Sequence, residues 1–469
     1  MTRLGGAASA TAQLAELASL PRRQLILEAA HELDRLVVDE ADRLHLVWVR
    51  VPARSGPPVV VLLAEDAAGP ASPARALSRL VATGPGRWPT GAGGAIRWTG
   101  PAIRAGDDTG GLAATASNDL LAGQVDGRPA VLKAYRLLGS DRGEGGLLAA
   151  LAGGFTPRPL AEIGYRPPGP AAELPLGLVT ERLPGRTLDR PLLDGLRQAW
   201  RAGRPDLDPD TEAALTRVRS ALGGFGAALE LACGPRPVDP AQAVRIRRDE
   251  LRAELQALDD PAAHGRPARF GPVLAAAAAS VAGLTQPDPG PAHCDLHLAN
   301  VLLGRDRVFF VDVAQPDPHR SAADDGAALR RAVECMALDV LVDRVAAAQL
   351  RAPIEVVDEL LATASAGSSD GPGPLESVLP MEFAVTRRWV ARVSDRLDPW
   401  GAGGRLNLPY LSRLVHDLRH HTDRGDRHYA GLAWYHLAQA CAHRPARTLT
   451  RGKPKPEPAL EPKPAAEPA

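Results

Sequence analysis

The stretch "HCDLHLANVLLGRDRVFFVD", residues 293–312, contains several side chains that could do chemistry. Its apolar runs "VLL" and "VFFV" on either side of "GRDR" predict a tight antiparallel hairpin. Pairing that is symmetric about the turn puts 301 opposite 311 and 303 opposite 309, so Asn300 and Asp312 should lie side by side at the open end. Two oxygen-bearing side chains there suit a hard cation such as Mg²⁺. Asp295, on the loop that enters the hairpin, would be free to orient a hydroxyl group.

Lys133 is the second candidate, because lysine is rare in this chain. Only four of the 55 basic residues are lysines, and three of them lie in the terminal segment "RGKPKPEPALEPKPAAEPA". In a chain that otherwise uses arginine, an isolated lysine indicates a site that needs a compact ammonium group. Lys133 falls in the run "AVLKAYR" of a predicted strand, where an unpaired ammonium would be costly. We therefore expect either an anionic partner for Lys133 or a position at the sheet edge.

Hydrophobic periodicity and turn signals predict the elements that hold these residues. The sequence "LLAGQVDGRPAVLKAYR" predicts a hairpin, "GEGGLLAALAGG" a short helix and "LGLVTERLPG" a strand that ends in a turn. Beyond residue 186 the pattern is mainly helical, with the 293–312 stretch as the clear interruption. In the first 95 residues, "LPRRQLILEAAHELDRLV" has helical periodicity, whereas "RLHLVWVRVP" and "GPPVVVLLAED" predict strands.

Composition limits the classes of partner and compartment. The 55 basic residues balance 55 acidic ones, so nothing indicates a general affinity for nucleic acid or anionic membranes. No apolar run reaches the roughly 18 residues that suggest a membrane span. The four cysteines lie far apart and form neither a disulfide framework nor a zinc module. A cytoplasmic protein with a small-molecule partner is the expectation.

The spacing His293, Asp295, Leu296, Asn300 resembles the H-x-D-L-x-x-x-N catalytic loop of the protein-kinase-like phosphotransferases, and Asp312 stands where their second metal-binding aspartate would be. His297 makes the sequence more similar to the small-molecule branch of aminoglycoside phosphotransferases and choline kinases, which includes the maltokinases. The resemblance covers roughly residues 100 to 445 and is carried by three short motifs.

The resemblance implies a role for each matching residue. Lys133 would contact the phosphates of ATP, and Asp295 would be the catalytic residue that receives the acceptor hydroxyl proton. Asn300 and Asp312 would hold Mg²⁺. Glu144 would be the helix partner of Lys133, with Glu162 as a weaker candidate. The backbone of Glu181 to Leu183 would hold adenine. Ser117 and Asn118 would lie in a turn over the phosphates.

The implied fold is α+β and two-lobed, with a small β-rich N-lobe and a large helical C-lobe, preceded by an extra α+β unit. The predicted ranges are 1–95 for this accessory, cap-like unit, 96–185 for the N-lobe, 186–446 for the C-lobe with the catalytic loop, and 447–469 for a disordered tail. The implied activity is ATP- and Mg²⁺-dependent transfer of the γ-phosphate to a hydroxyl of a small molecule such as a sugar, an aminoglycoside or an amino alcohol.

Two departures from the family pattern bear on activity. Cys294 replaces the glycine that usually precedes the catalytic aspartate, so the backbone of the loop could differ. Residues 313–315 replace the usual aromatic-Gly or aromatic-Glu pair after Asp312. These departures motivate an alternative function as a kinase-like regulatory module that binds nucleotide and acts through protein partners, with the N-terminal unit as the partner-binding part.

Further hypotheses concern individual residues. His293, Asp295 and His297 could be ligands of a hydrolytic metal together with histidines of "HDLRHHTDRGDRH", residues 416–428, but that hypothesis leaves Asn300, Asp312 and Lys133 unexplained. His293 is expected to be structural and to shape the loop through a backbone hydrogen bond. Asp324 and Asp325 precede a predicted long helix and are expected to cap it. The sequence does not identify the phosphate acceptor.

Overall fold

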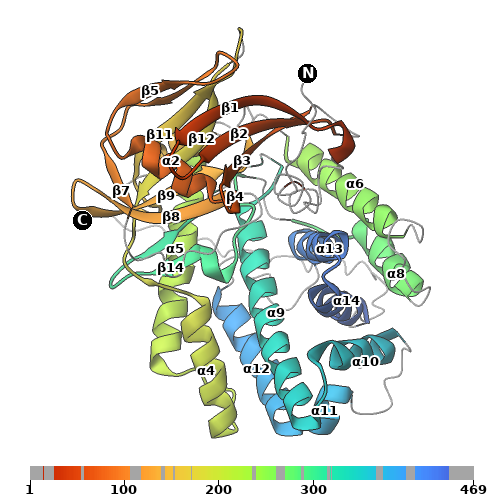
Figure 1. Ribbon diagram of the computed structural model, residues 1–469. Coiled ribbons are helices and arrows are strands. Elements are labelled where there is room, and N and C mark those ends of the chain that lie inside the picture. The colour runs from red at the N-terminus through yellow and green to blue at the C-terminus, as the bar shows by residue number, and fades with distance from the viewer. Residues whose placement is uncertain are drawn as a thin grey trace, which may run out of the picture.

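The computed structural model describes residues 14, 26–53, 58–105, 118–138, 143–151, 154–170, 172–234, 239–259, 270–286, 290–313, 317, 319–365, 373–397 and 407–442. A β-rich part lies at one end of the molecule and a helical part at the other (Figure 1). The predicted α+β fold, with a β-rich lobe and a helical lobe, is confirmed.

The first sheet is antiparallel and begins the β-rich part. After the short 3₁₀ helix η1 (Leu27–Ala29) it contains β1 (His31–Asp39), β2 (Leu44–Val51), β3 (Val59–Asp66) and β4 (Gly69–Ala71). The helix expected over residues 20–37 is wrong beyond residue 30, because residues 31–39 pair along β2 as a strand. Helical periodicity there is a weak preference, and pairing with a neighbouring strand overrides it.

The second sheet has seven strands in the order β5-β6-β11-β12-β9-β8-β7. Its strands are β5 (Gly86–Pro89), β6 (Ala95–Trp98), β7 (Ile103–Ala105), β8 (Asn118–Val125), β9 (Arg128–Tyr135), β11 (Pro159–Arg166) and β12 (Leu174–Glu181). The predicted hairpin is β8 and β9, and Lys133 lies in β9 between Leu120 of β8 and Leu178 of β12. Directly opposite residues share a face of a sheet, so Asn118, Leu120, Lys133 and Tyr135 lie on one face.

Helix α2 (Pro73–Val81) covers the other face of β8 and β9. Asp119 of β8 accepts hydrogen bonds from the Ser72 hydroxyl at 2.5 Å and from the Ala74 backbone N–H at 3.0 Å. The first sheet also gains a strand from beyond Lys133, because β10 (Leu137–Leu138) pairs with β3. The second sheet includes β5, which precedes residue 95, and the first sheet includes β10, which follows it. The division into an accessory unit and an N-lobe at residue 95 stays a prediction.

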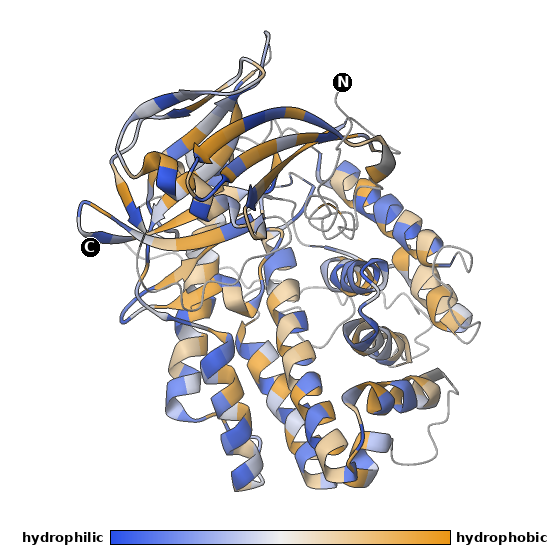
Figure 2. Ribbon diagram, viewed as in Figure 1, coloured by the Kyte–Doolittle hydropathy of each residue, from blue (hydrophilic) through white to orange (hydrophobic). Residues whose placement is uncertain are grey.

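The helical part contains α3 (Glu144–Leu151), which packs on the second sheet, and ten further helices among the residues that the structure describes. These are α4 (Asp189–Ala202), α5 (Pro209–Cys233), α6 (Pro240–Leu258), α8 (Gly271–Val281), α9 (Ala322–Gln349), α10 (Pro353–Ser365), α11 (Pro374–Val378), α12 (Pro380–Leu397), α13 (Leu408–Asp423) and α14 (Arg427–Ala442). Hydrophobic and hydrophilic residues alternate along them, as expected for helices that bury one face (Figure 2). None of the described helices combines the length and apolar character that crossing a membrane requires.

A third, small sheet carries the stretch of interest. It consists of β13 (Arg186–Thr187), β14 (Val301–Leu303) and β15 (Val308–Phe310), and η3 (Leu298–Asn300) leads into it. The predicted hairpin is present, but its predicted register is wrong by one residue: 301 pairs with 310 and 303 with 308. The turn closes between Gly304 and Arg307, with the Gly304 N–H donating to the Arg307 carbonyl at 2.9 Å, and this shorter loop sets the register.

Candidate active site

His293 shapes the loop before β14 from a fully buried position. Its backbone N–H donates to Asp325 Oδ2 at 2.9 Å, and its ring Nε2 donates to the Val311 carbonyl at 2.9 Å. Burial lowers the pKa of His293, which favours the neutral ring that donates a single hydrogen bond here. The expected structural role of His293 is confirmed by these contacts.

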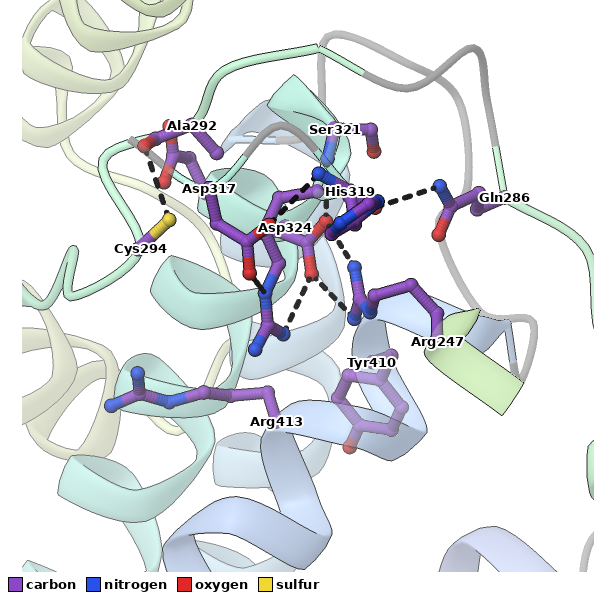
Figure 3. Close-up of polar contacts among 12 residues, drawn as sticks. Arg247, Gln286, Ala292, Cys294, Asp317, His319, Ser321, Asp324, Tyr410 and Arg413 are labelled. Atoms are coloured by element: carbon purple, nitrogen blue, oxygen red, sulfur yellow. Dashed lines mark hydrogen bonds and ion pairs between the residues drawn. The ribbon is translucent and has the colours of Figure 1, made fainter. Parts of the chain in front are cut away.

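Cys294 adopts the left-handed backbone conformation that glycine accepts most readily, with φ of 69°. Its thiol donates to the Ala292 carbonyl at 3.2 Å, and Figure 3 shows the sulfur turned toward that carbonyl. Burial raises the pKa of Cys294 to about 12, so the sulfur is a protonated donor. The loop therefore has the glycine-type geometry although the residue is a cysteine.

This conformation leads to a prediction about two substitutions at Cys294. Cys294→Gly removes the Cβ that makes φ of 69° unfavourable, whereas Cys294→Ala keeps the Cβ and removes only the thiol. We expect the glycine variant to have a free energy of unfolding about 1 kcal/mol larger than the alanine variant, measured by urea denaturation. Equal stabilities, or a more stable alanine variant, would show that the left-handed backbone carries no cost.

Asp324 and Asp325 at the start of α9 have different roles. Asp324 caps the helix by accepting the Ser321 N–H at 2.8 Å, and it forms an ion pair with buried Arg247 at 2.9 Å (Figure 3). Asp325, expected to be a cap, instead accepts from the His293 N–H of the loop. Burial raises the pKa of Asp325 to about 7. The start of α9 thus holds the candidate catalytic loop in place.

The raised pKa of Asp325 predicts the direction of a pH effect on stability. The folded protein takes up a proton at Asp325 near pH 7, whereas in the unfolded chain this carboxyl has its ordinary pKa of 3.8. Its contribution to stability therefore increases as the pH falls from about 7 towards 4 and is lost as the pH rises through 7. The side chain at position 325 cannot titrate in the variant Asp325→Asn. Between about pH 4 and 7 the free energy of unfolding of this variant should therefore fall less steeply with rising pH than that of wild type, by up to about 1.4 kcal/mol per pH unit. Parallel stability–pH curves for the two proteins would contradict the assignment.

Asp295 and Asn300 are held to each other on the loop. The Asn300 Nδ2 donates to the Asp295 backbone carbonyl at 3.0 Å, and Asn300 itself is buried. The Asp295 side chain is 55% exposed, and Arg413 Nη1 lies 3.7 Å from its Oδ1. A carboxylate exposed beside a buried, hydrogen-bonded loop is available to an incoming hydroxyl group.

Lys133 joins the sheet to the hairpin. Its Nζ donates to both carboxylate oxygens of Glu144, at 2.8 and 2.9 Å, and also forms an ion pair with Asp312. The Tyr135 hydroxyl donates to Glu144 at 2.8 Å. Burial lowers the pKa of Lys133, but the two carboxylates raise it more, so the net shift is upward. The expected anionic partner is therefore present twice, from α3 and from the hairpin.

Asp312 reaches Lys133 because its backbone leaves the β15 direction. Its φ is 58°, a left-handed value that is uncommon outside glycine, asparagine and aspartate. Burial raises the pKa of Asp312 and Lys133 lowers it more, so the carboxylate stays ionised. The other candidate partner of Lys133, Glu162, lies instead against Gly145 of α3, where a glycine leaves room for its carboxylate.

The other residues expected around the nucleotide lie on or next to the same sheet. Asn118 is buried opposite Tyr135, on the face that carries Lys133. Ser117 lies outside the described residues. Glu181 ends β12, where its carboxylate accepts the Arg158 N–H at 2.9 Å, and half-buried Leu183 follows it. Their roles toward a nucleotide stay predictions.

The histidine-rich segment forms pairs in the structure. His421 lies 3.4 Å from Asp426, and His428 lies 2.7 Å from Asp339. Within the described ranges, no group of three or more His, Cys, Asp or Glu side chains is placed to hold a metal ion. Asn300 and Asp312 offer a different donor set, one amide and one ionised carboxylate, which fits a hard cation that keeps several water ligands.

Sequence reasoning missed Arg413 and Asp417 on α13. Arg413 Nε lies 2.9 Å from Asp417 Oδ1, and Asp417 Oδ2 lies 3.3 Å from Arg331 Nε on α9. The i, i+4 spacing of Arg413 and Asp417 on a predicted helix was a signal for their pairing. Their closeness to Asp295 depends on a long-range contact that no local pattern predicts.

No protein-family model and no curated protein matches the chain. Among solved structures, the chain is similar to glucosamine kinase in complex with glucosamine, ADP and inorganic phosphate, with 17% identity and a TM-score of 0.43 over 94% of this chain and 98% of that one. It is similar to aminoglycoside phosphotransferase APH(4)-Ia with ADP and hygromycin B, with 14% identity and a TM-score of 0.38 over 75% and 96%. A protein described as a fructosamine-3-kinase of Thermobifida fusca has 16% identity and a TM-score of 0.35 over 73% and 94%. Because these identities and TM-scores are low, the family resemblance of the motifs rests on the residues of this sequence and not on these neighbours.

Proposed function

We propose that the chain is an ATP- and Mg²⁺-dependent phosphotransferase that moves the γ-phosphate to a hydroxyl of a small molecule. One observation carries this proposal: Lys133 of the sheet lies between Glu144 of α3 and Asp312 beyond the hairpin. Asn300 of the same hairpin holds the Asp295 loop. An ammonium group for the phosphates, two oxygen ligands for a metal ion and an exposed carboxylate for the acceptor hydroxyl are the groups that phosphoryl transfer uses.

Each residue has one part in the proposed reaction. Lys133 binds oxygens of the nucleotide phosphates as a point charge, and its position is fixed by Glu144, which in turn accepts a hydrogen bond from the Tyr135 hydroxyl. Asp295 accepts the proton of the acceptor hydroxyl. The acceptor oxygen forms a bond to the γ-phosphorus, the bond from that phosphorus to the β,γ-bridging oxygen breaks, and the electron pair leaves with ADP. Atoms and charge balance without a further reactant.

Asn300 and Asp312 would hold Mg²⁺, which supplies charge neutralisation on the phosphates when it is bound. Lys133 Nζ donates to Oδ1 of Asp312 in this structure. The second carboxylate oxygen of Asp312 and the amide oxygen of Asn300 therefore remain as ligands for a cation. The acceptor is a hydroxylated small molecule of the sugar, aminoglycoside or amino alcohol type.

The proposal is tested by acceptor-dependent ADP formation. Wild-type protein with Mg-ATP is presented with sugars, aminoglycosides, amino alcohols and a protein acceptor, and the rate of ADP release is compared with the rate without acceptor. We expect at least one small hydroxylated acceptor to raise the rate well above that of water. Binding of Mg-ATP without any acceptor-dependent turnover would instead support a regulatory module that only binds nucleotide.

A further inference from the structure

Arg413 is a charged side chain that lies beside Asp295 in an ion pair. It belongs to α13 of the helical part, whereas the nucleotide side of the site is built from Lys133, Glu144 and Asp312. Its Nη1 is 3.7 Å from Asp295 Oδ1, so the two groups are neighbours without a full hydrogen bond. Figure 3 shows the Arg413 side chain extending away from the Arg247–Asp324 pair. Arg413 thus lies beside the candidate base and belongs to a different element from the residues expected to bind the nucleotide.

Arg413 also forms an ion pair on its own helix. Its Nε lies 2.9 Å from Asp417 Oδ1, and Asp417 Oδ2 lies 3.3 Å from Nε of Arg331, whose side chain is 2% exposed. Burial lowers the pKa of Arg331, but the surrounding acidic groups raise it more, so it stays a permanent partner for Asp417. If Arg413 turned to solvent, the nearly buried carboxylate of Asp417 would lose one of its two arginine partners, which costs free energy.

Four other acidic groups of this region have partners of their own. Asp317 pairs with Arg320 at 3.3 Å, and Asp324 pairs with Arg247 at 2.9 Å. Glu334 pairs with Arg330 at 2.9 Å. Asp325 is buried against the His293 backbone. An acceptor that approaches Asp295 therefore meets the exposed carboxylate of Asp295 and, beside it, the guanidinium of Arg413.

We propose that Arg413 determines acceptor specificity, by donating a hydrogen bond to an oxygen next to the hydroxyl that Asp295 deprotonates. The spacing of 3.7 Å between the two groups suits two neighbouring oxygens, one giving a proton to the carboxylate and one receiving a hydrogen bond from the guanidinium. An ammonium in the second position would meet the Arg413 charge at close range. The preferred acceptor is a neutral polyol such as a sugar with adjacent hydroxyls. This inference rests on the proposed phosphotransferase function.

The experiment compares acceptors that differ only at the neighbouring group. Glucose and glucosamine form one pair, glycerol and 2-amino-1,3-propanediol a second, and kanamycin represents the polycations. Wild type is compared with Arg413→Gln, with Arg413→Lys, which restores a cation, and with Arg419→Gln as a matched control. Arg419 forms an i, i+4 pair with Asp423 on the same helix at 3.6 Å and is not part of the site. The Kd for Mg-ATP and the melting temperature are measured for each variant.

We expect wild type to prefer the neutral member of a pair by at least about tenfold in kcat/KM. Arg413→Gln should lower kcat/KM for the neutral acceptor about 10- to 100-fold, with the Kd for Mg-ATP unchanged. The ratio of kcat/KM between the neutral and the amine acceptor should become smaller than in wild type. Arg413→Lys should recover part of the loss, and Arg419→Gln should behave as wild type.

The inference is overturned, and the proposed function kept, if wild type transfers phosphate to the amine member of a pair as well as or better than to the neutral member, or if Arg413→Gln matches Arg419→Gln. If wild type transfers phosphate to no member of the panel, the proposed function itself fails and the assignment of Arg413 fails with it. If Arg413→Gln is unfolded, Arg413→Lys is used to test the inference. A kcat/KM ratio between neutral and amine acceptors like that of wild type supports a requirement for the cation. A kcat/KM ratio near one overturns the inference.

Discussion

Asp295→Asn is expected to lower kcat for phosphoryl transfer about 100- to 10,000-fold, because asparagine cannot accept the acceptor proton. The Kd for Mg-ATP should stay close to the wild-type value, since Lys133, Asn300 and Asp312 are untouched. The Asn300 hydrogen bond should also persist, because it goes to the backbone carbonyl of Asp295 and not to its side chain. Steady-state kinetics and calorimetric titration with Mg-ATP measure the two quantities separately.

A matched control for Asp295→Asn is Asp306→Asn. Asp306 is an exposed aspartate in the turn between β14 and β15, on the same hairpin as the site. This variant should keep wild-type kcat. A kcat of Asp295→Asn near that of Asp306→Asn would remove Asp295 from the chemistry.

Lys133→Met is expected to lower kcat/KM for ATP by about 100-fold or more, because it removes a charged hydrogen-bond donor from the phosphates. It also leaves Glu144 and Asp312 facing each other without the cation that now lies between them. Breaking such a nearly buried pair on one side should reduce the free energy of unfolding by about 3 kcal/mol. Kinetics with varied ATP and urea denaturation check the two parts.

Lys133→Arg separates the charge of the lysine from its shape. The guanidinium keeps the positive charge, so this variant should recover most of the stability that Lys133→Met loses. It should not recover full activity, because a planar guanidinium pairs differently with carboxylates and phosphates than a compact ammonium does. Full activity with arginine would leave unexplained why Lys133 is the one lysine among the residues that the structure describes.

The sequence predicted some contacts of the candidate site and missed others. The hairpin, the strand position of Lys133 and its pairing with Glu144 followed from apolar runs, one rare residue type and a motif. The register of the hairpin was wrong by one residue, because it depends on how the turn from Gly304 to Arg307 closes. The left-handed backbone of Asp312 then brings the carboxylate to Lys133, and that conformation has no signal in the sequence.

Residues distant in the sequence account for the rest. Nothing local indicates that Asp325 of α9 holds the His293 backbone or that Arg413 of α13 lies beside Asp295. Cys294 is a similar case, because a cysteine gives no hint of the glycine-type backbone that the loop adopts there. The strand at residues 31–39 could not be distinguished from a helix by periodicity alone, since pairing with β2 decides it.

The destination of the γ-phosphate tests the central claim most directly. Wild-type protein is incubated with Mg-ATP labelled in the γ-phosphate and with a panel of hydroxylated small molecules, and the labelled products are separated. We expect label on the hydroxyl of at least one acceptor with wild type, and on none with Asp295→Asn. Label that stays on ATP, or that appears only as inorganic phosphate with every acceptor, would contradict the claim.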